Sequence, residues 1–146
     1  MRKPEADAWA FDVLSSIERS APFETTHVEL KAICIEPEHW AKQFAGLANA
    51  ARWHPILLLL GVDQKKGIVG LEPFEVGDWY SGLRAHFEYG EAPTLLYQNF
   101  LTFQEKTVGV FVFSTDNPPY VIAEGKKGGP RTVPWRFGSN TGVAGR

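Results

Sequence analysis

The chain has 146 residues, of which 44% are hydrophobic and 22% charged, and its formal net charge is −2. These values are ordinary for a soluble globular domain, which at this length buries roughly two-thirds of its unfolded surface. The near-neutral charge leaves a nucleic-acid partner open, because a local basic patch matters more for binding than the sum of all charges.

Cysteine content and hydropathy exclude several further classes. Cys34 is the only cysteine, which excludes an internal disulfide and a cysteine zinc cage and makes a cytoplasmic location the default expectation. Residues 1–7 are charged without an apolar segment behind them, so we expect no signal peptide. The longest apolar run, Ile56–Leu60, is far too short to span a bilayer, and we expect no membrane partner.

The first third of the chain changes from a helical to a strand pattern. Residues 8–19 have apolar side chains at helical spacing and are followed by Ala21-Pro22, which predicts a helix that ends there. Residues 27–35 alternate with period two, which predicts a strand with one apolar and one polar face. The polar face holds His27, Glu29 and Lys31.

Pro37 marks the start of the clearest predicted helix, because proline suits the first helical position. Its apolar residues form one stripe that would pack against a sheet, namely Trp40, Phe44, Leu47, Ala48 and Ala51. Residues 56–62 lack alternation and are too short for a free helix. We therefore predict a central strand there, buried on both faces.

The rest of the chain predicts one more helix and several strands. The helix has an apolar stripe that includes Trp79 and Leu83, although Gly77 and Gly82 weaken its pattern. The predicted strands cover residues 68–71, 95–103, 107–113, 120–122 and 132–137, with a hairpin around 104–106. Residues 125–131 predict a flexible basic loop, and residues 138–146 show no packing pattern.

The predicted fold class is α/β (α+β), a single compact domain in which about three helices pack on a mixed sheet. We predict an N-terminal helix and lead-in over residues 1–20 and the main domain over residues 21–146. Residues 138–146 would be a tail or a linker into further domains beyond Arg146.

Three carboxylates form the first candidate site. Glu29 lies on the polar face of a predicted strand, and Asp63 lies at the carboxyl end of the central strand, where ligand sites in α/β sheets gather. Glu24 would join them if residues 23–26 form a turn. Such oxygen ligands suit Mg²⁺ or Mn²⁺, which would activate water and stabilise a displaced phosphate. The alternative is that these acids are solvated, as acids at strand ends usually are.

Basic residues form the second candidate site. Lys31 shares a strand face with Glu29 and would either stabilise a charged phosphate or form an ion pair with that neighbour. Other basic residues in turns and loops are candidates for phosphate contacts, which supply most of the non-specific affinity for nucleic acid. They are Lys65, Lys66, Lys126, Lys127, Arg131 and Arg136.

Two other chemistries are excluded by spacing. Residues 125–132 contain glycines, lysines and a threonine but not the spacing of a Walker A loop, which argues against nucleotide binding there. The four histidines show no metal-ligand spacing, and Cys34 lies on the apolar face of its predicted strand. A cysteine–histidine nucleophile is therefore not expected.

Several short motifs recur in one order and indicate a family. In the first motif, the acid Glu24 is followed after four residues by Glu-Leu-Lys at 29–31. The motifs that follow are Leu-Ala-Asn at 47–49, Leu-Gly-Val-Asp at 60–63, Ile-Val-Gly-Leu at 68–71 and Arg-Phe-Gly-Ser at 136–139. This order resembles the Schlafen-type, Alba-related DNA-binding domain family, also called the Schlafen AlbA-like domain. The resemblance spans about residues 24–144.

The resemblance implies an α/β domain that binds nucleic acid. In some Schlafen members three carboxylates form a metal-dependent endoribonuclease site that acts on transfer and ribosomal RNA, and they would correspond to Glu24, Glu29 and Asp63. One departure stands out, because the family has Gly-Gly between its Asn and the buried strand. This chain has the bulky Arg52 and Trp53 in that segment, so the pocket is reshaped.

Three functional hypotheses follow. The first is a nucleic-acid-binding module for transfer RNA, other RNA or DNA, as part of a larger regulator. The second is a divalent-metal-dependent endoribonuclease that uses Glu24, Glu29 and Asp63, with Lys31 as a catalytic partner. The third is a scaffold domain that forms a homodimer through the hairpin of residues 95–113.

Overall fold

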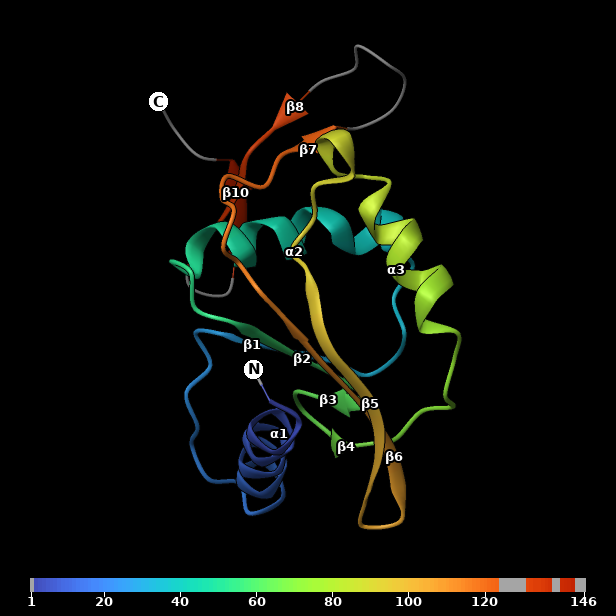
Figure 1. Ribbon diagram of the computed structural model, residues 1–146. Helices are drawn as coiled ribbons and strands as arrows, with labels where there is room; N and C mark the ends of the chain where they lie inside the picture. Colours follow the sequence, from blue (N-terminus) through green and yellow to red (C-terminus); the bar gives the residue numbers. More distant parts are fainter. Residues whose placement is uncertain (1, 124–130, 138–139, 144–146) are drawn as a thin grey trace. The chain divides into compact units, whose positions relative to one another are not determined.

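The computed structural model describes residues 2–123, 131–137 and 140–143 (Figure 1). Contacts divide the chain into two compact units, each built from three segments. The sheet unit consists of Met1–Cys34, Pro55–Phe74 and Leu95–Phe113, and the helical unit consists of Ile35–His54, Glu75–Thr94 and Ser114–Arg146. The first helix therefore belongs to the same unit as the sheet.

The sheet unit contains a four-stranded sheet in the order β1-β2-β6-β5. Its strands are β1 (Val28–Lys31), β2 (Ile56–Leu60), β6 (Lys106–Phe113) and β5 (Leu95–Phe103). β1 runs parallel to β2, whereas β2 pairs with β6 and β6 with β5 in antiparallel fashion. This mixed sheet, together with the three α-helices of the described residues, confirms the predicted fold class.

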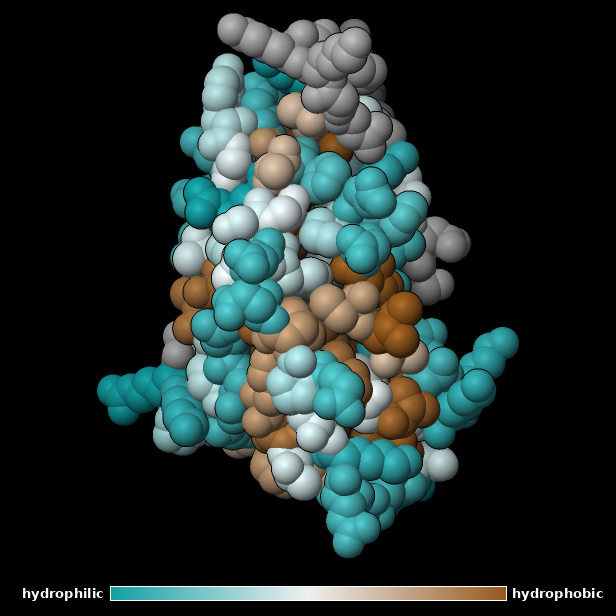
Figure 2. All heavy atoms as spheres, turned by 90° about the vertical axis from the view of Figure 1, so that its right-hand side faces the viewer, coloured by the Kyte–Doolittle hydropathy of each residue, from teal (hydrophilic) through white to brown (hydrophobic). Residues whose placement is uncertain are grey.

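β2 is an interior strand of this sheet, as its sequence predicts. All five residues of β2 are buried, and the strand lies between β1 and β6. The predicted hairpin is also confirmed, because β5 and β6 are paired neighbours. Its turn is formed by exposed polar residues, and the hydrophilic lower end of the molecule in Figure 2 is this turn.

Helix α1 (Lys3–Glu18) packs against the sheet within the same unit. Ala6, Ala10, Val13 and Leu14 are spaced by three or four positions and belong to one buried cluster with side chains of β1, β2 and β6. The helix begins five residues earlier than the predicted range of 8–19, because Pro4 in its first turn supplies the fixed φ of a helix start.

The predicted strand over residues 56–62 is divided by Gly61. Its φ of +90° turns the chain, so that β2 ends at Leu60 and β3 (Val62–Asp63) pairs instead with β4 (Gly67–Ile68). A side chain at Gly61 would lie within about 3.1 Å of the Gly70 backbone. Glycine is therefore required here both for the left-handed conformation and for the close approach.

The helical unit contains α2 (Pro37–Ala50) and α3 (Val76–Arg84). The apolar stripes predicted for both helices are buried, and aromatic rings join them. Trp40 stacks on Phe44 and on Trp79, with ring centroids 4.5 and 5.9 Å apart. A short 3₁₀ helix, Glu88–Gly90, follows α3.

Two small ladders complete the helical unit. β7 (Ile122–Ala123) pairs with β8 (Arg131–Thr132), and β9 (Pro134–Phe137) pairs with β10 (Asn140–Val143). The predicted strand over residues 132–137 is thus two strands with Val133 between them, and Pro134 is the first residue of the second, a position that proline tolerates.

The prediction that residues 138–146 lack packing is wrong for β10, which pairs with β9 and contacts α2. Gly46 on α2 permits this approach, since a Cβ there would lie 2.7 Å from Thr141 and 3.3 Å from the Trp135 backbone. β10 has no recognisable strand pattern of its own, because most of its residues are polar or glycine.

None of the helices in the described residues has the length and hydropathy needed to cross a membrane.

Candidate functional site

Glu24 lies in the turn after Pro22, and its carboxylate is bound locally. The backbone N–H of Thr26 donates to Glu24 Oε1 over 2.8 Å, and the hydroxyl of Thr26 donates to the same oxygen. These hydrogen bonds, first that of the hydroxyl, lower the pKa of Glu24 because they stabilise its charged form. The carboxylate therefore serves to close its own turn.

Glu29 and Lys31 lie on the same face of β1, as the period-two pattern predicts. Lys31 Nζ lies 3.3 Å from Glu29 Oε1, and only 21% of the Lys31 side chain and 16% of the Glu29 side chain are exposed. Lys31 thus forms the ion pair with Glu29 that was the predicted alternative to a phosphate contact. Lys31 also lines a small hollow of the sheet unit.

Asp63 ends β3 and holds the hairpin turn that follows. Its Oδ1 accepts hydrogen bonds from the backbone N–H groups of Lys65 and Lys66, both over 2.8 Å. The amides of Lys66 and Lys65, together with the charges of the two lysines, lower the pKa of Asp63. The carboxylate is ionised and fixes the turn that carries two exposed lysines.

The three carboxylates are not gathered as metal ligands. Within residues 2–123, 131–137 and 140–143, no three His, Cys, Asp or Glu side chains are grouped so that they could hold a metal ion. Glu24, Glu29 and Asp63 instead take partners from their own turn or strand. This arrangement does not fit the Mg²⁺ or Mn²⁺ site that the spacing and the resemblance led us to expect.

The sheet unit does bring three of the predicted site residues together. Lys31, Asp63 and Lys65 line one open hollow of about 330 Å³, whose remaining walls are Leu30, Ala32, Val62 and Gln64. The hollow exists because β1 and β3 contact each other within this unit. Lys65 and Lys66 are both exposed at the tip of the β3–β4 hairpin, which predicts a concentration of positive charge there.

The other predicted basic residues belong to the helical unit or lie outside the described residues. Arg131 on β8 lies 3.5 Å from Glu88 and is 57% exposed, so part of its charge is offset by a surface ion pair. Arg136 lies on β9, opposite Thr141 of β10. Lys126 and Lys127 lie outside the described residues.

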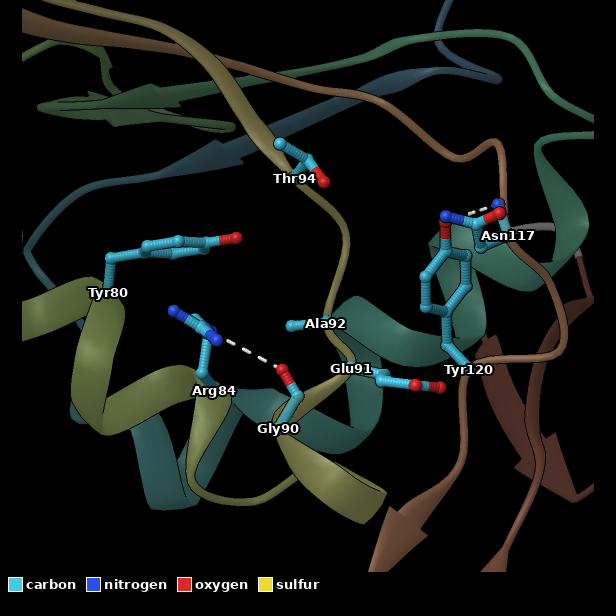
Figure 3. Close-up of a pocket in the computed structure, with 8 residues that line it drawn as sticks. All are labelled: Tyr80, Arg84, Gly90, Glu91, Ala92, Thr94, Asn117 and Tyr120. Atoms are coloured by element: carbon cyan, nitrogen blue, oxygen red, sulfur yellow. Dashed lines mark hydrogen bonds between the residues drawn. The ribbon is translucent and has the colours of Figure 1, made fainter.

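A larger hollow of about 690 Å³ opens in the helical unit (Figure 3). Tyr80 and Arg84 of α3 lie on one side of the view and Asn117 and Tyr120 on the other. Arg84 Nε donates to Gly90 O over 3.3 Å, and its guanidinium lies 5.9 Å from the Tyr80 ring centroid.

Both tyrosine hydroxyls of this hollow are already hydrogen-bonded. The Tyr80 hydroxyl donates to Pro93 O over 2.6 Å, and the Tyr120 hydroxyl accepts from the Asn117 backbone N–H over 3.0 Å. Sequence reasoning missed this hollow, because its walls come from separate segments that share no motif.

Asn49 fixes the segment that forms one wall of this hollow. This residue is 4% exposed. Its Nδ2 donates to Tyr120 O and Pro134 O over 3.0 and 2.8 Å, and its Oδ1 accepts from Tyr120 N over 2.6 Å. Asn49 is the polar residue of the Leu-Ala-Asn motif, and in this chain it joins α2 to the segments before β7 and at β9.

Comparison with known proteins supports the fold alone. No family model and no curated protein matches the chain. The crystal structure of the DIP2311 protein from Corynebacterium diphtheriae is similar, with a TM-score of 0.63 and 16% sequence identity. The similarity covers 97% of this chain and 30% of that one, so this chain corresponds to less than a third of the neighbour's length.

Proposed function

We propose that this chain binds nucleic acid, RNA or DNA, by contacting phosphates through the basic tip of the β3–β4 hairpin. The observation that carries the proposal is the pair of exposed lysines, Lys65 and Lys66, on a turn that Asp63 holds in place. Phosphate contacts by lysine are the main source of sequence-independent affinity for nucleic acid.

The turn geometry favours this function over a simply solvated tip. Asp63 uses one carboxylate oxygen for two backbone amides, so its role at the turn is to order the backbone. Ordering the tip lowers the entropy lost when the lysines meet a ligand. Lys31 and Lys65 share the neighbouring hollow, which offers room for a phosphate or sugar between them.

Hydrolysis is not part of this proposal. The endoribonuclease alternative requires Glu24, Glu29 and Asp63 to share a cation, and the described side chains form no such group. The resemblance to the Schlafen AlbA-like domain supports binding, and the hairpin lysines fall within residues 24–144, which carry that resemblance.

The test is a double variant, Lys65→Ala with Lys66→Ala, in the full chain. Binding of a labelled single-stranded RNA should weaken, and the slope of log K against log salt should flatten by about 1.4, because each lost phosphate contact on a single strand contributes about 0.7. The matched control is Lys3→Ala with Lys42→Ala, which removes the same charge from exposed positions on α1 and α2. Equal affinity and slope in the two double variants would refute the proposed contact.

A further inference from the structure

A second surface, in the helical unit, presents a large aromatic side chain to solvent. Trp53 follows the end of α2 and is 67% exposed. Exposed tryptophan is uncommon in a globular surface, since the indole is among the largest apolar groups a protein can bury. Its position therefore calls for a reason other than folding.

The backbone at Trp53 is unfavourable for the residues that occupy it. Arg52 and Trp53 have φ values of 52° and 67°, in the left-handed region that favours glycine. Two consecutive bulky residues therefore hold a conformation that side chains other than glycine rarely adopt. Strain of this kind concentrates where a side chain is needed in one position.

A hollow of about 450 Å³ lies beside the exposed indole. Its walls are Asn49, Arg52, Trp53, Pro118, Pro119 and Trp135. The amide of Asn49 is engaged by Tyr120 and Pro134, so this wall offers little to a polar ligand. Two indoles and two prolines make the hollow apolar, and Arg52 is the one charged residue that lines it.

The walls are fixed before any ligand arrives. Asn49 holds the backbone of Tyr120, directly after Pro118 and Pro119, and the backbone of Pro134, directly before Trp135. The buried side chain of Asn49 therefore joins three segments that line the hollow: the end of α2, the segment of Pro118 and Pro119, and the start of β9. A preformed apolar hollow with few polar groups is the usual form of a small-molecule site.

We infer that this hollow stacks an unpaired nucleobase on Trp53 and Trp135, with the Arg52 guanidinium on an adjoining phosphate. The inference rests on the proposed function and deepens it, because it makes single-stranded nucleic acid the substrate class. Stacking on aromatic rings is how proteins hold single strands without reading sequence. A proline-rich peptide also suits indoles, but it carries no negative charge to complement Arg52.

The experiment compares two single-stranded oligonucleotides of equal length, one with bases and one abasic, so that the number of phosphates is the same. Base stacking predicts that the full chain binds the base-bearing strand about 5- to 150-fold more tightly than the abasic strand. Trp53→Gly should remove most of this preference, whereas Trp53→Phe should retain part of it. Glycine suits the left-handed backbone at this position, so the loss cannot be attributed to misfolding.

Tyr89→Ala is the matched control. Tyr89 belongs to the same unit, is 83% exposed and has a φ of 56°, but it does not line the hollow. This variant should keep the full preference for the base-bearing strand.

Three outcomes would overturn the inference. If the chain and Trp53→Gly bind both strands equally, the hollow holds no base while the proposed phosphate contacts stand. If neither strand binds, the proposed function fails and the inference with it. Binding of a proline-rich peptide in place of the base-bearing strand, lost in Trp53→Gly, would assign the hollow to a peptide instead.

Discussion

Replacement of Asn49 by alanine is the most informative perturbation of the helical unit. The Asn49 side chain makes three hydrogen bonds, two from its Nδ2 to Tyr120 O and Pro134 O and one from Tyr120 N to its Oδ1. All three join α2 to distant parts of the chain. Alanine removes the three bonds together and leaves buried backbone groups without their partner.

The expected cost follows from the burial of these groups. A typical hydrogen bond contributes about 0.5–1.5 kcal/mol to stability, and a buried group left unpaired costs about 1–3 kcal/mol. We therefore expect Asn49→Ala to lower the free energy of unfolding by about 3 kcal/mol, a large part of the ~5–15 kcal/mol that stabilises an ordinary domain.

Urea denaturation followed by tryptophan fluorescence and circular dichroism measures this change. The matched control is Asn117→Ala, in the same segment as Tyr120, because the Asn117 side chain is exposed and its backbone N–H makes the bond to Tyr120. The control should change stability by no more than about 0.5 kcal/mol. An Asn49→Ala variant as stable as the control would refute the role assigned to Asn49.

Three further predictions concern single contacts. The Tyr97 hydroxyl donates to Asp7 over 2.7 Å, and burial followed by this bond raises the pKa of Tyr97 to about 12. An ultraviolet titration should therefore show a phenol that ionises near pH 12 and is missing in Tyr97→Phe. The stability gained from Tyr97 should persist below pH 10 and vanish as pH rises through about 12. Asp63→Ala should lower the urea midpoint at neutral pH, and the difference should shrink as pH falls below 3.8, because the lowered pKa of Asp63 means that its stabilising contact requires the charged form. Glu75 accepts from Gly77 N at the start of α3, so Glu75→Ala should cost about 0.5–1 kcal/mol in the same denaturation assay.

The elements that the sequence predicts well are those with a strong local pattern. Pro37 at a first helical position and the stripe through Trp40 and Phe44 place α2 at its observed start. The continuous apolar run Ile56–Leu60 is an interior strand because such a run can be satisfied only between two neighbours. β10 was missed because its pairing partner, not its own sequence, decides that it is a strand.

The candidate site was predicted less well, for a physical reason. Spacing along the chain predicted Asp63 at the end of the central strand, whereas it ends the separate strand β3. Spacing also could not show which groups the oxygens of Glu24 and Asp63 accept from. Each carboxylate is bound by amides or hydroxyls two or three residues away, and such local bonds compete with a shared metal ion.

The hollow beside Trp53 depends on backbone angles that sequence does not reveal. The bulky residues Arg52 and Trp53 are visible in the sequence, but their conformation is not. The left-handed φ at Trp53 and the approach of Trp135 follow only from the fold.

The most direct test of the central claim is a salt titration of the full chain with a labelled single-stranded RNA, followed by fluorescence anisotropy from about 50 to 200 mM salt. The account predicts measurable binding that weakens with salt. The slope of log K against log salt should be about −1.4 or steeper, because the two hairpin lysines alone contribute that much. Absence of binding at the lowest salt, or binding that does not change with salt, would contradict it.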